Sequence, residues 1–320
     1  MKENLKISVA MIVKNEEEML GRCLKTVKGA DEIVVCDTGS TDKTVEIAKK
    51  FTDKVFTDFT WCDHFGKARQ HSKDKCTGDW ILTIDADEVL LNTFEEVREV
   101  INKAEAEGYQ FVNVTTLAEN NHSRNRFPRI YKNIPEIQWR GAAHNYLVIT
   151  EGKRKTYESN IIERYGYSPA HKLDPNRTMR ILENAVKEDD SLTRERYYLG
   201  REYMSRKKYD ECISVLEEYL KRSDFKPERS DAYLMIAKAY WFTQRGDKAR
   251  EACLQSIGIN PNFKEALLLM ADMYYEPNRS RWASFAELAD NTGVLFVRQK
   301  GGVVKQEVGS EGSELTSTPK

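Results

Sequence analysis

The sequence lacks an excess of charge of either sign. Its 320 residues include 50 Lys and Arg and 51 Asp and Glu, which gives a formal net charge of −1. A protein that holds nucleic acid by bulk electrostatics needs a clear excess of positive charge, so this balance argues against that class. Nucleic acid could then be bound only through a local basic groove. Charged residues still make up 32% of the chain and the mean hydropathy is −0.64, which indicates a well-solvated globular protein.

The sequence also lacks a long hydrophobic run. The longest apolar stretch, 266–271, is far shorter than the ~20 residues that a membrane helix needs. The first residues lead into a short strand-like run and then into the charged segment 14–18, which does not resemble the core of a signal peptide. The expected location is therefore the cytoplasm, without a membrane segment.

Cysteines are few and scattered. The six are Cys23, Cys36, Cys62, Cys76, Cys212 and Cys253. No two of them form a Cys-x-x-Cys pair and none has a histidine at zinc-finger spacing, so the pattern predicts neither a zinc site nor a disulfide framework. Reduced thiols are expected, as in other proteins of the cytoplasm.

The distribution of apolar residues divides the chain into two halves. Up to about residue 170, strands are expected at 7–13, 33–36, 54–56 and 80–84, and helices at 17–27, 41–51 and 95–107. This alternation predicts an α/β fold with a largely parallel, Rossmann-like sheet covered by helices. The later segments 110–117, 127–131 and 146–149 favour added antiparallel strands.

The second half is helical in period and repetitive. Ala237 and Tyr240 recur as Ala271 and Tyr274, 34 residues later, and Gly200 occupies an equivalent place upstream. A 34-residue period with small residues where paired helices press together resembles tetratricopeptide repeats, although an unrelated helical bundle is the alternative. Two full repeats and a partial third are few for a solenoid, so we expect them to pack against the α/β domain or to form a homodimer.

The length suits two domains of about 150 residues each. We expect the α/β domain over 1–172 and the helical repeat domain over 173–298. The remaining segment, 299–320, lacks periodic apolar residues and is predicted to be a disordered tail.

The acidic residues with the clearest positional signal are Asp85 and Asp87, which follow the apolar strand 80–84. In an open α/β sheet the carboxyl ends of the strands face the ligand crevice. Two carboxylates at such an end can hold a divalent cation, and the cation can neutralise a diphosphate. Asp37 ends the second strand at the same expected edge, while the adjacent Gly39 and Ser40 are explained by a strand-to-helix turn.

Four blocks of sequence together resemble the family 2 glycosyltransferases of the GT-A fold. They span 8–16, 37–42, 61–69 and 78–88, and their order and spacing match the family over roughly residues 5–170. With the trailing repeats, the chain is similar to the bacterial and phage branch that includes sublancin-type peptide S-glycosyltransferases. The resemblance implies an inverting glycosyltransferase, a hexosyltransferase that moves a sugar from a UDP-sugar donor to an acceptor, with a peptide or protein side chain as one candidate acceptor.

The resemblance also implies roles for individual residues. Those implied to contact the nucleotide are Lys14, Asn15, Glu16, Asp37, Arg69, Asp85 and Arg164. Asp87 would ligate Mn²⁺ or Mg²⁺, and Asp85 would contact the ribose or a metal-bound water. Both are therefore candidates for metal binding and catalysis. Two of these residues have plainer alternatives, because Asn15 could cap the next helix and Arg69 could form a surface ion pair.

Two positions depart from the family pattern. Asn145 stands where relatives commonly have glutamate, and an amide cannot take a proton from the acceptor, so the base is unassigned. Arg164 replaces a histidine that often ligates the metal. Arg164 could contact the diphosphate directly, and His171 could supply the missing metal ligand. The candidates for the catalytic base are Glu136, Glu119 and Asp63. His144 is a further candidate, either as a catalytic residue or in place of His171.

Other functions stay open at this point. A transferase domain that has lost its chemistry could serve as a binding platform for the repeats; Asn145 and Arg164 favour that hypothesis, and the intact acidic residues oppose it. The acceptor could also be a glycan, a lipid or a modified nucleic acid. A nucleotidyltransferase is disfavoured because segment 14–18 is not the glycine-rich loop that it would need.

Overall fold

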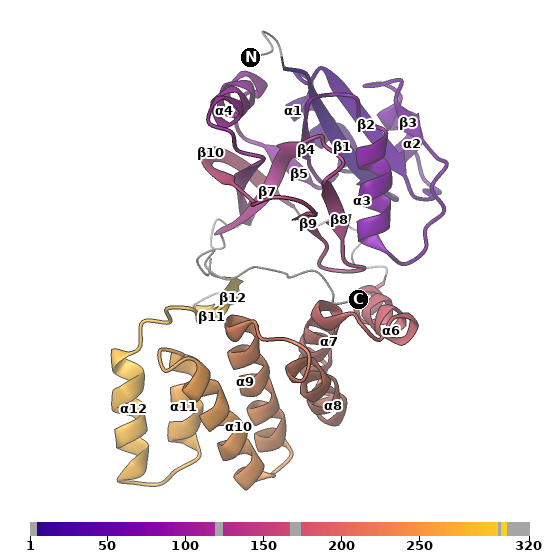
Figure 1. Ribbon diagram of the computed structural model, residues 1–320. Helices are drawn as coiled ribbons and strands as arrows, with labels where there is room; N and C mark the ends of the chain where they lie inside the picture. The colour runs from indigo at the N-terminus through magenta and orange to yellow at the C-terminus, as the bar shows by residue number, and fades with distance from the viewer. Residues whose placement is uncertain (1–4, 119–123, 167–173, 300–301, 306–320) are drawn as a thin grey trace. The chain divides into compact units, whose positions relative to one another are not determined.

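The computed structural model describes residues 5–118, 124–166, 174–299 and 302–305 (Figure 1). The chain divides into two compact units, Met1–Arg177 and Thr178–Lys320. The boundary expected after residue 172 lies outside the described residues.

The first unit is built on a mixed sheet of eight strands in the order β3-β2-β1-β4-β7-β6-β10-β5. In chain order these strands are β1 Ile7–Val13, β2 Glu32–Asp37, β3 Val55–Phe56, β4 Trp80–Thr83, β5 Glu88–Leu90, β6 Phe111–Ala118, β7 Arg124–Lys132 and β10 Thr156–Tyr165. β3, β2, β1 and β4 are parallel, whereas β7 is antiparallel to both β4 and β6. A separate hairpin pairs β8 (Ile137–Arg140) with β9 (Tyr146–Ile149).

Helices cover both faces of this sheet. They are α1 Leu20–Thr26, α2 Thr44–Ala48, α3 Phe65–Asp74 and α4 Phe94–Ala106. One core contains Trp80 and Leu82 with the buried faces of α1 and α4, and a second core on the other face contains Ile81 and Tyr131. Because both faces of β4 are buried, its sequence is a continuous apolar run rather than an alternating one.

The predicted parallel strands and α4 are confirmed. α1 begins later than predicted, because Asn15 has a φ of 56° and the chain turns through Glu16 before the helix starts. The patterns did not predict α3, β5, β8 or β10. α3 has few apolar residues and β5 is only three residues long, so neither produces a strong periodic signal.

The sheet curls so that its last strand returns to the end of β4. β5 starts five residues after Thr83, yet it pairs at the far end of the strand order. In a flat sheet four strand spacings would separate them by about 19 Å. The connecting residues form a tight turn, with the Glu88 N–H donating to the Asp85 carbonyl at 3.0 Å, so they cannot cover that distance. The strands β7, β6 and β10 must therefore bend round and bring their inward side chains together.

Gly66 allows α3 to approach the β8–β9 loop closely. A Cβ on Gly66 would lie 2.6 Å from the carbonyl oxygen of Gly141, and backbone cannot move aside as a flexible side chain can. We therefore expect Gly66→Ala to lower the free energy of unfolding by about 2 kcal/mol in chemical denaturation. Gly21→Ala in α1 is the matched control, because its Cβ would meet only ordinary contact at 3.7 Å. Equal stability of the two variants would contradict the close approach.

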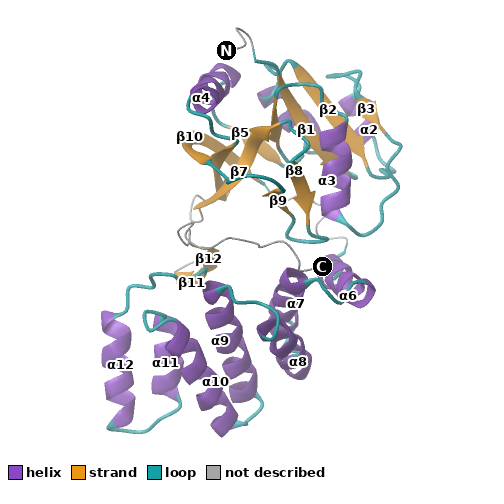
Figure 2. Cartoon of the chain, viewed as in Figure 1, coloured by secondary structure: helices purple, strands orange, loops and turns teal. Residues whose placement is uncertain are grey.

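Where the structure describes it, the second unit consists of helices and one hairpin (Figure 2). The helices from the unit boundary onward are α6 Arg177–Glu188, α7 Thr193–Ser205, α8 Tyr209–Leu220, α9 Lys226–Phe242, α10 Gly246–Ile259, α11 Lys264–Asp272 and α12 Asn278–Leu288. Gly200 packs directly on Leu216, where an added Cβ would lie only 2.4 Å from the leucine side chain. Ala237 and Ala249 are completely buried, as predicted for the small residues between paired helices.

The structure differs from the prediction in the first residues of the expected tail. Gly302–Lys305 (β12) pairs antiparallel with Phe296–Gln299 (β11), whereas we expected no structure from residue 299 on. The β-branched Val297, Val303 and Val304 favour strands over so short a distance. The rest of the tail, 306–320, lies outside the described residues. Among the helices that the structure describes, none is long and apolar enough to cross a membrane.

Candidate active site at the carboxyl edge of the sheet

The loops that follow β1 and β2 are joined to each other. The Asn15 N–H donates to Ser40 Oγ at 2.9 Å, and Asn15 Oδ1 accepts from the Thr41 N–H at 2.8 Å. The Glu16 N–H donates to Thr44 Oγ1 at 2.7 Å. Asn15 therefore connects two loops and does not cap α1, so the capping alternative is wrong. Lys14 is exposed at the end of β1. The nucleotide contacts of these residues stay predictions.

Asp37 lies at the predicted edge but is engaged by its own turn. Its Oδ2 accepts from the Gly39 and Ser40 N–H groups, both at 3.0 Å, and Ser40 Oγ donates to Oδ1. The side chain is buried, with 4% of the residue exposed. Since β2, β1 and β4 run parallel, Asp37 and Asp85 follow strands that end on the same edge of the sheet.

Asp85 is held between two arginines. Arg69 Nη2 of α3 lies 2.6 Å from Asp85 Oδ1, and Arg129 Nη1 of β7 lies 3.4 Å from Oδ2. Burial alone would raise the pKa of Asp85, but the two guanidinium charges outweigh burial and hold that pKa well below its usual range. Arg69 is only 8% exposed and lies over the ring of Trp139, so the arginine of this ion pair is buried and the pair is not the surface pair considered above.

Glu88 closes the acidic turn. Its Oε2 accepts from the Asp85 N–H at 2.8 Å, and its Oε1 accepts from Arg129 Nη2 at 2.6 Å. Burial has the largest effect on Glu88 and raises its pKa to about 7, although the positive charge of the neighbouring Arg129 lowers it. The turn Asp85–Glu88 is also fixed through the backbone of Asp87, because the Asp87 carbonyl accepts from the Gly166 N–H at 2.9 Å and from Arg22 Nη2 at 3.3 Å.

Glu163 of β10 completes this buried cluster. Its Oε2 lies 3.6 Å from Arg129 Nε, and neither of its oxygens accepts a hydrogen bond from the described residues. Burial, followed by the nearby Glu88 charge, raises the pKa of Glu163 well above its usual value. We use the name acidic cluster for Asp85, Glu88 and Glu163 with the two arginines, Arg69 and Arg129.

The raised pKa of Glu163 predicts a pH-dependent stability. The folded chain keeps this proton at pH values where the unfolded chain has lost it, so the stabilisation is complete below about pH 4 and declines as the pH rises. Glu163→Gln cannot ionise. Its free energy of unfolding relative to the parent should therefore increase between pH 5 and pH 7, by at most about 1.4 kcal/mol per pH unit. Urea denaturation across that range measures it, and a pH-independent difference would contradict it.

The side chains that the structure describes do not form a metal site by themselves. Within the described residues no group of three His, Cys, Asp or Glu side chains is placed so that it could hold a metal ion, and both oxygens of Asp85 face arginines. Magnesium is commonly bound by one or two carboxylates together with substrate phosphates. Asp87, partly exposed on the turn, suits that arrangement better than Asp85 does. His171, the other predicted ligand, lies outside the described residues, as does Glu119.

The remaining predicted residues are spread more widely. Glu136 comes four residues after Lys132, and Lys132 pairs with Trp80 at the amino end of β4. Asp85 follows the carboxyl end of β4, so the position of Glu136 does not fit its predicted role as a base. His144 is exposed in the β8–β9 loop, whose Gly141 and Ala142 carbonyls accept from the start of α3.

Two further predicted residues lie on β10 and just before α3. Arg164 adjoins Glu163 on β10, and successive strand residues face opposite sides of a sheet, so Arg164 points away from the Glu163–Arg129 contact. Asp63 accepts from Trp61 Nε1 at 2.8 Å, just before α3.

Sequence reasoning missed Arg129 and Glu163 as residues of the site. Arg129 lies on β7 and Glu163 on β10, both far along the chain from Asp85, and no motif contains them. The available signal was a charged residue within an otherwise apolar strand. Such a residue is rarely buried without a partner, so it indicates a buried ion pair.

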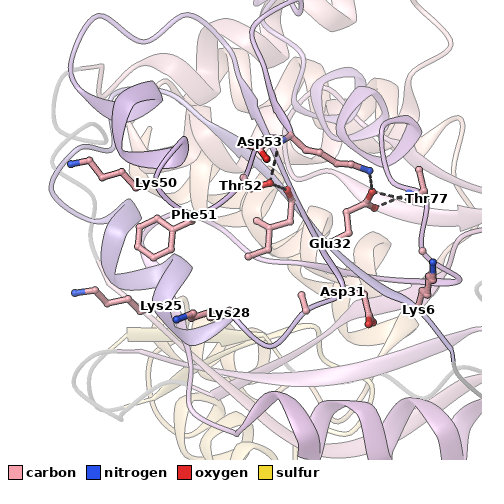
Figure 3. Close-up of a pocket in the computed structure, with 14 residues that line it drawn as sticks. Lys6, Lys25, Lys28, Asp31, Glu32, Lys50, Phe51, Thr52, Asp53 and Thr77 are labelled. Atoms are coloured by element: carbon pink, nitrogen blue, oxygen red, sulfur yellow. Dashed lines mark hydrogen bonds and ion pairs between the residues drawn. The ribbon is translucent and has the colours of Figure 1, made fainter.

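A depression of about 980 Å³ lies at the opposite edge of the sheet (Figure 3). Its lining includes Lys6 before β1, Glu32 at the start of β2 and Gly78 before β4. Glu32 is already paired with Lys54 and accepts from Thr77 Oγ1 at 2.8 Å. In Figure 3, Lys25 and Lys50 point the same way, away from Lys6, so the lysines do not converge on one ligand position. This depression is therefore separate from the acidic edge.

Comparison with known proteins identifies both parts of the chain. Residues 8–166 match the family described as "Glycosyl transferase family 2", and residues 230–263 match "Tetratricopeptide repeat". A TPR repeat-containing protein of Synechococcus elongatus is 35% identical over 173 residues, covering 50% of this chain and 42% of the relative. The SPbeta prophage-derived glycosyltransferase SunS of Bacillus subtilis is 40% identical over 83 residues, covering 25% of this chain and 20% of the relative.

The solved structure of S. aureus TarS is similar at 15% identity and a TM-score of 0.41, covering 83% of this chain and 55% of that chain. The chain spans less than half the length of the two curated relatives described above. The amino-terminal domain of this chain is therefore a member of glycosyltransferase family 2, and the helical domain that follows it contains a tetratricopeptide repeat.

Proposed function

We propose that the chain transfers a sugar from a UDP-sugar donor, with inversion at the sugar C1, to a peptide or protein side chain. The observation that carries the proposal is the single edge at which β1, β2 and β4 end, with the Asp37 turn and the Asp85–Glu88 turn both on it. This is the place where an open α/β sheet binds its ligand. The family match over residues 8–166 supports the reaction class.

The charges at this edge suit the departure of UDP. As the acceptor bonds to the sugar C1, the bond to the diphosphate oxygen breaks and its electron pair leaves with UDP, so negative charge grows on the diphosphate. Asp87 would hold a Mn²⁺ or Mg²⁺ ion against the diphosphate, and the ion would supply Lewis-acid stabilisation there. In the same proposal, Asp37 and Arg69 lie nearer the base and ribose.

The acceptor side has its own candidates. Asn145 cannot act as a base, whereas His144 is an exposed candidate in the β8–β9 loop, whose carbonyls accept from the start of α3. A cysteine acceptor would need little help, because a free thiol has a pKa near ~8.5. Helical repeats commonly hold extended peptides, which is why we favour a peptide acceptor over a glycan or lipid.

Slow hydrolysis of donor sugars tests the donor half of this proposal without an acceptor. Release of UDP from a panel of UDP-sugars should occur with Mn²⁺ or Mg²⁺ and fall on addition of EDTA, while GDP-sugars serve as the control for nucleotide selectivity. Turnover unaffected by EDTA would indicate that Arg164, rather than a metal ion, neutralises the diphosphate. Neither turnover nor binding of UDP would refute the proposal and favour the binding platform.

A further inference from the structure

β7 has one residue more than β6 where the two strands run side by side. Val112 pairs with Ile130 and Asn113 pairs with Pro128, so Arg129 is the extra residue between the two pairs. Such a β-bulge breaks the regular alternation of side chains, and bulges of this kind are frequent beside active sites because they redirect a side chain. The bulge therefore determines where the Arg129 guanidinium points.

The redirected guanidinium contacts three carboxyl groups, two from the Asp85–Glu88 turn and one from β10. Its Nη1 lies 3.4 Å from Asp85, its Nη2 2.6 Å from Glu88 and its Nε 3.6 Å from Glu163. The arginine side chain is 14% exposed, and those of Glu88 and Glu163 are 4% and 0% exposed. A planar guanidinium can address several oxygens at fixed angles, which a lysine ammonium cannot do.

These contacts hold the turn that carries Asp87. Asp85 and Glu88 are the two ends of that turn, and Arg129 binds both of their side chains. We propose that Arg129 is a positioning residue, which fixes the Asp85–Glu88 turn so that Asp87 faces the donor diphosphate, without touching the donor itself. The inference rests on the proposed function and adds to it a residue that no part of the family pattern named.

The test compares Arg129→Lys with Arg126→Lys, the same change three residues earlier on β7. Arg126 pairs with Glu158 at an exposed position, with side chains 43% and 52% exposed. The dissociation constants of UDP and of uridine, measured by ligand-observed NMR with MgCl₂, separate diphosphate contacts from base contacts. Arg129→Lys should weaken UDP binding about tenfold and leave uridine binding within about twofold, whereas Arg126→Lys should change neither. Melting temperatures monitor the fold.

Each outcome decides a different point. Parent protein that binds neither ligand refutes the proposed function. Parent-like UDP binding by a folded Arg129→Lys overturns the positioning role, and equal losses for UDP and uridine overturn it in favour of general disruption. If Arg129→Lys does not fold, Glu88→Gln replaces it, because it removes the charge that Arg129 binds at the other end of the turn. Selective loss of UDP binding in Glu88→Gln supports the inference, and unchanged binding overturns it.

Discussion

Asp87→Asn is expected to reduce release of UDP from the donor sugar by about 100-fold or more, while the melting temperature stays close to that of the parent. Asparagine has the size and shape of aspartate, and it keeps the backbone carbonyl that accepts from Gly166 and Arg22. The substitution removes the negative charge that the proposal assigns to the metal-bound diphosphate. Initial rates at saturating and limiting donor, with Mn²⁺ present, measure the loss.

Equal turnover by Asp87→Asn and parent would remove Asp87 from the mechanism. A variant that loses both turnover and thermal stability would show that the side chain is structural, which contradicts the role assigned to it. Glu158→Gln, an acid-to-amide change at an exposed ion pair of the same domain, controls for the loss of one negative charge.

Asp85→Asn, the same chemical change two residues earlier, is expected to act first on stability. It leaves Arg69 and Arg129 without the carboxylate that both of them face. Removing one partner of a fully buried ion pair costs about 3–5 kcal/mol, and because Asp85 is 33% exposed we expect about 2 kcal/mol here. Turnover should fall as well, since the turn loses one of its anchors. Chemical denaturation at pH 7 measures the stability loss.

The pH dependence of the stability loss in Asp85→Asn tests whether the ion pairs of Asp85 cause it. The pKa of Asp85 is lowered in the folded chain, so its contribution is complete above the unfolded pKa of about 3.9 and is lost as the pH falls through the folded pKa. The stabilisation that Asp85 itself contributes is thus present at pH 7, and the difference between parent and Asp85→Asn should shrink as the pH falls below 4. Parent-like stability at pH 7 would contradict the ion pairs described here.

The parallel half of the domain could be predicted because its signals are local. The strand at Ile7–Val13 and the strand at Trp80–Thr83 are short apolar runs, and α4 has an apolar face with a capping box formed by Thr93 and Glu96. The rule that ligands bind at the carboxyl ends of parallel strands then placed Asp37 and Asp85 at one edge without any coordinates.

The partners of those acids could not be predicted in the same way. Arg129 reaches Asp85 only because β7 bulges, and Glu163 reaches Arg129 only because the sheet curls back to β5. Bulges and curvature depend on pairing between distant strands, which a single sequence does not display. The family resemblance assigned the metal chiefly to Asp87 and gave Asp85 a contact with the ribose or a metal-bound water. The structure pairs Asp85 with two arginines, and the metal role of Asp87 stays a prediction.

A crystal structure of the chain with UDP and Mn²⁺ tests this division of roles most directly. The account predicts that the diphosphate and the ion lie beside the Asp87 carboxylate, with Asp85 still paired to Arg69 and Arg129. An ion bound by Asp85 after release from both arginines would contradict it, and so would UDP seated in the lysine-lined depression at the other edge of the sheet.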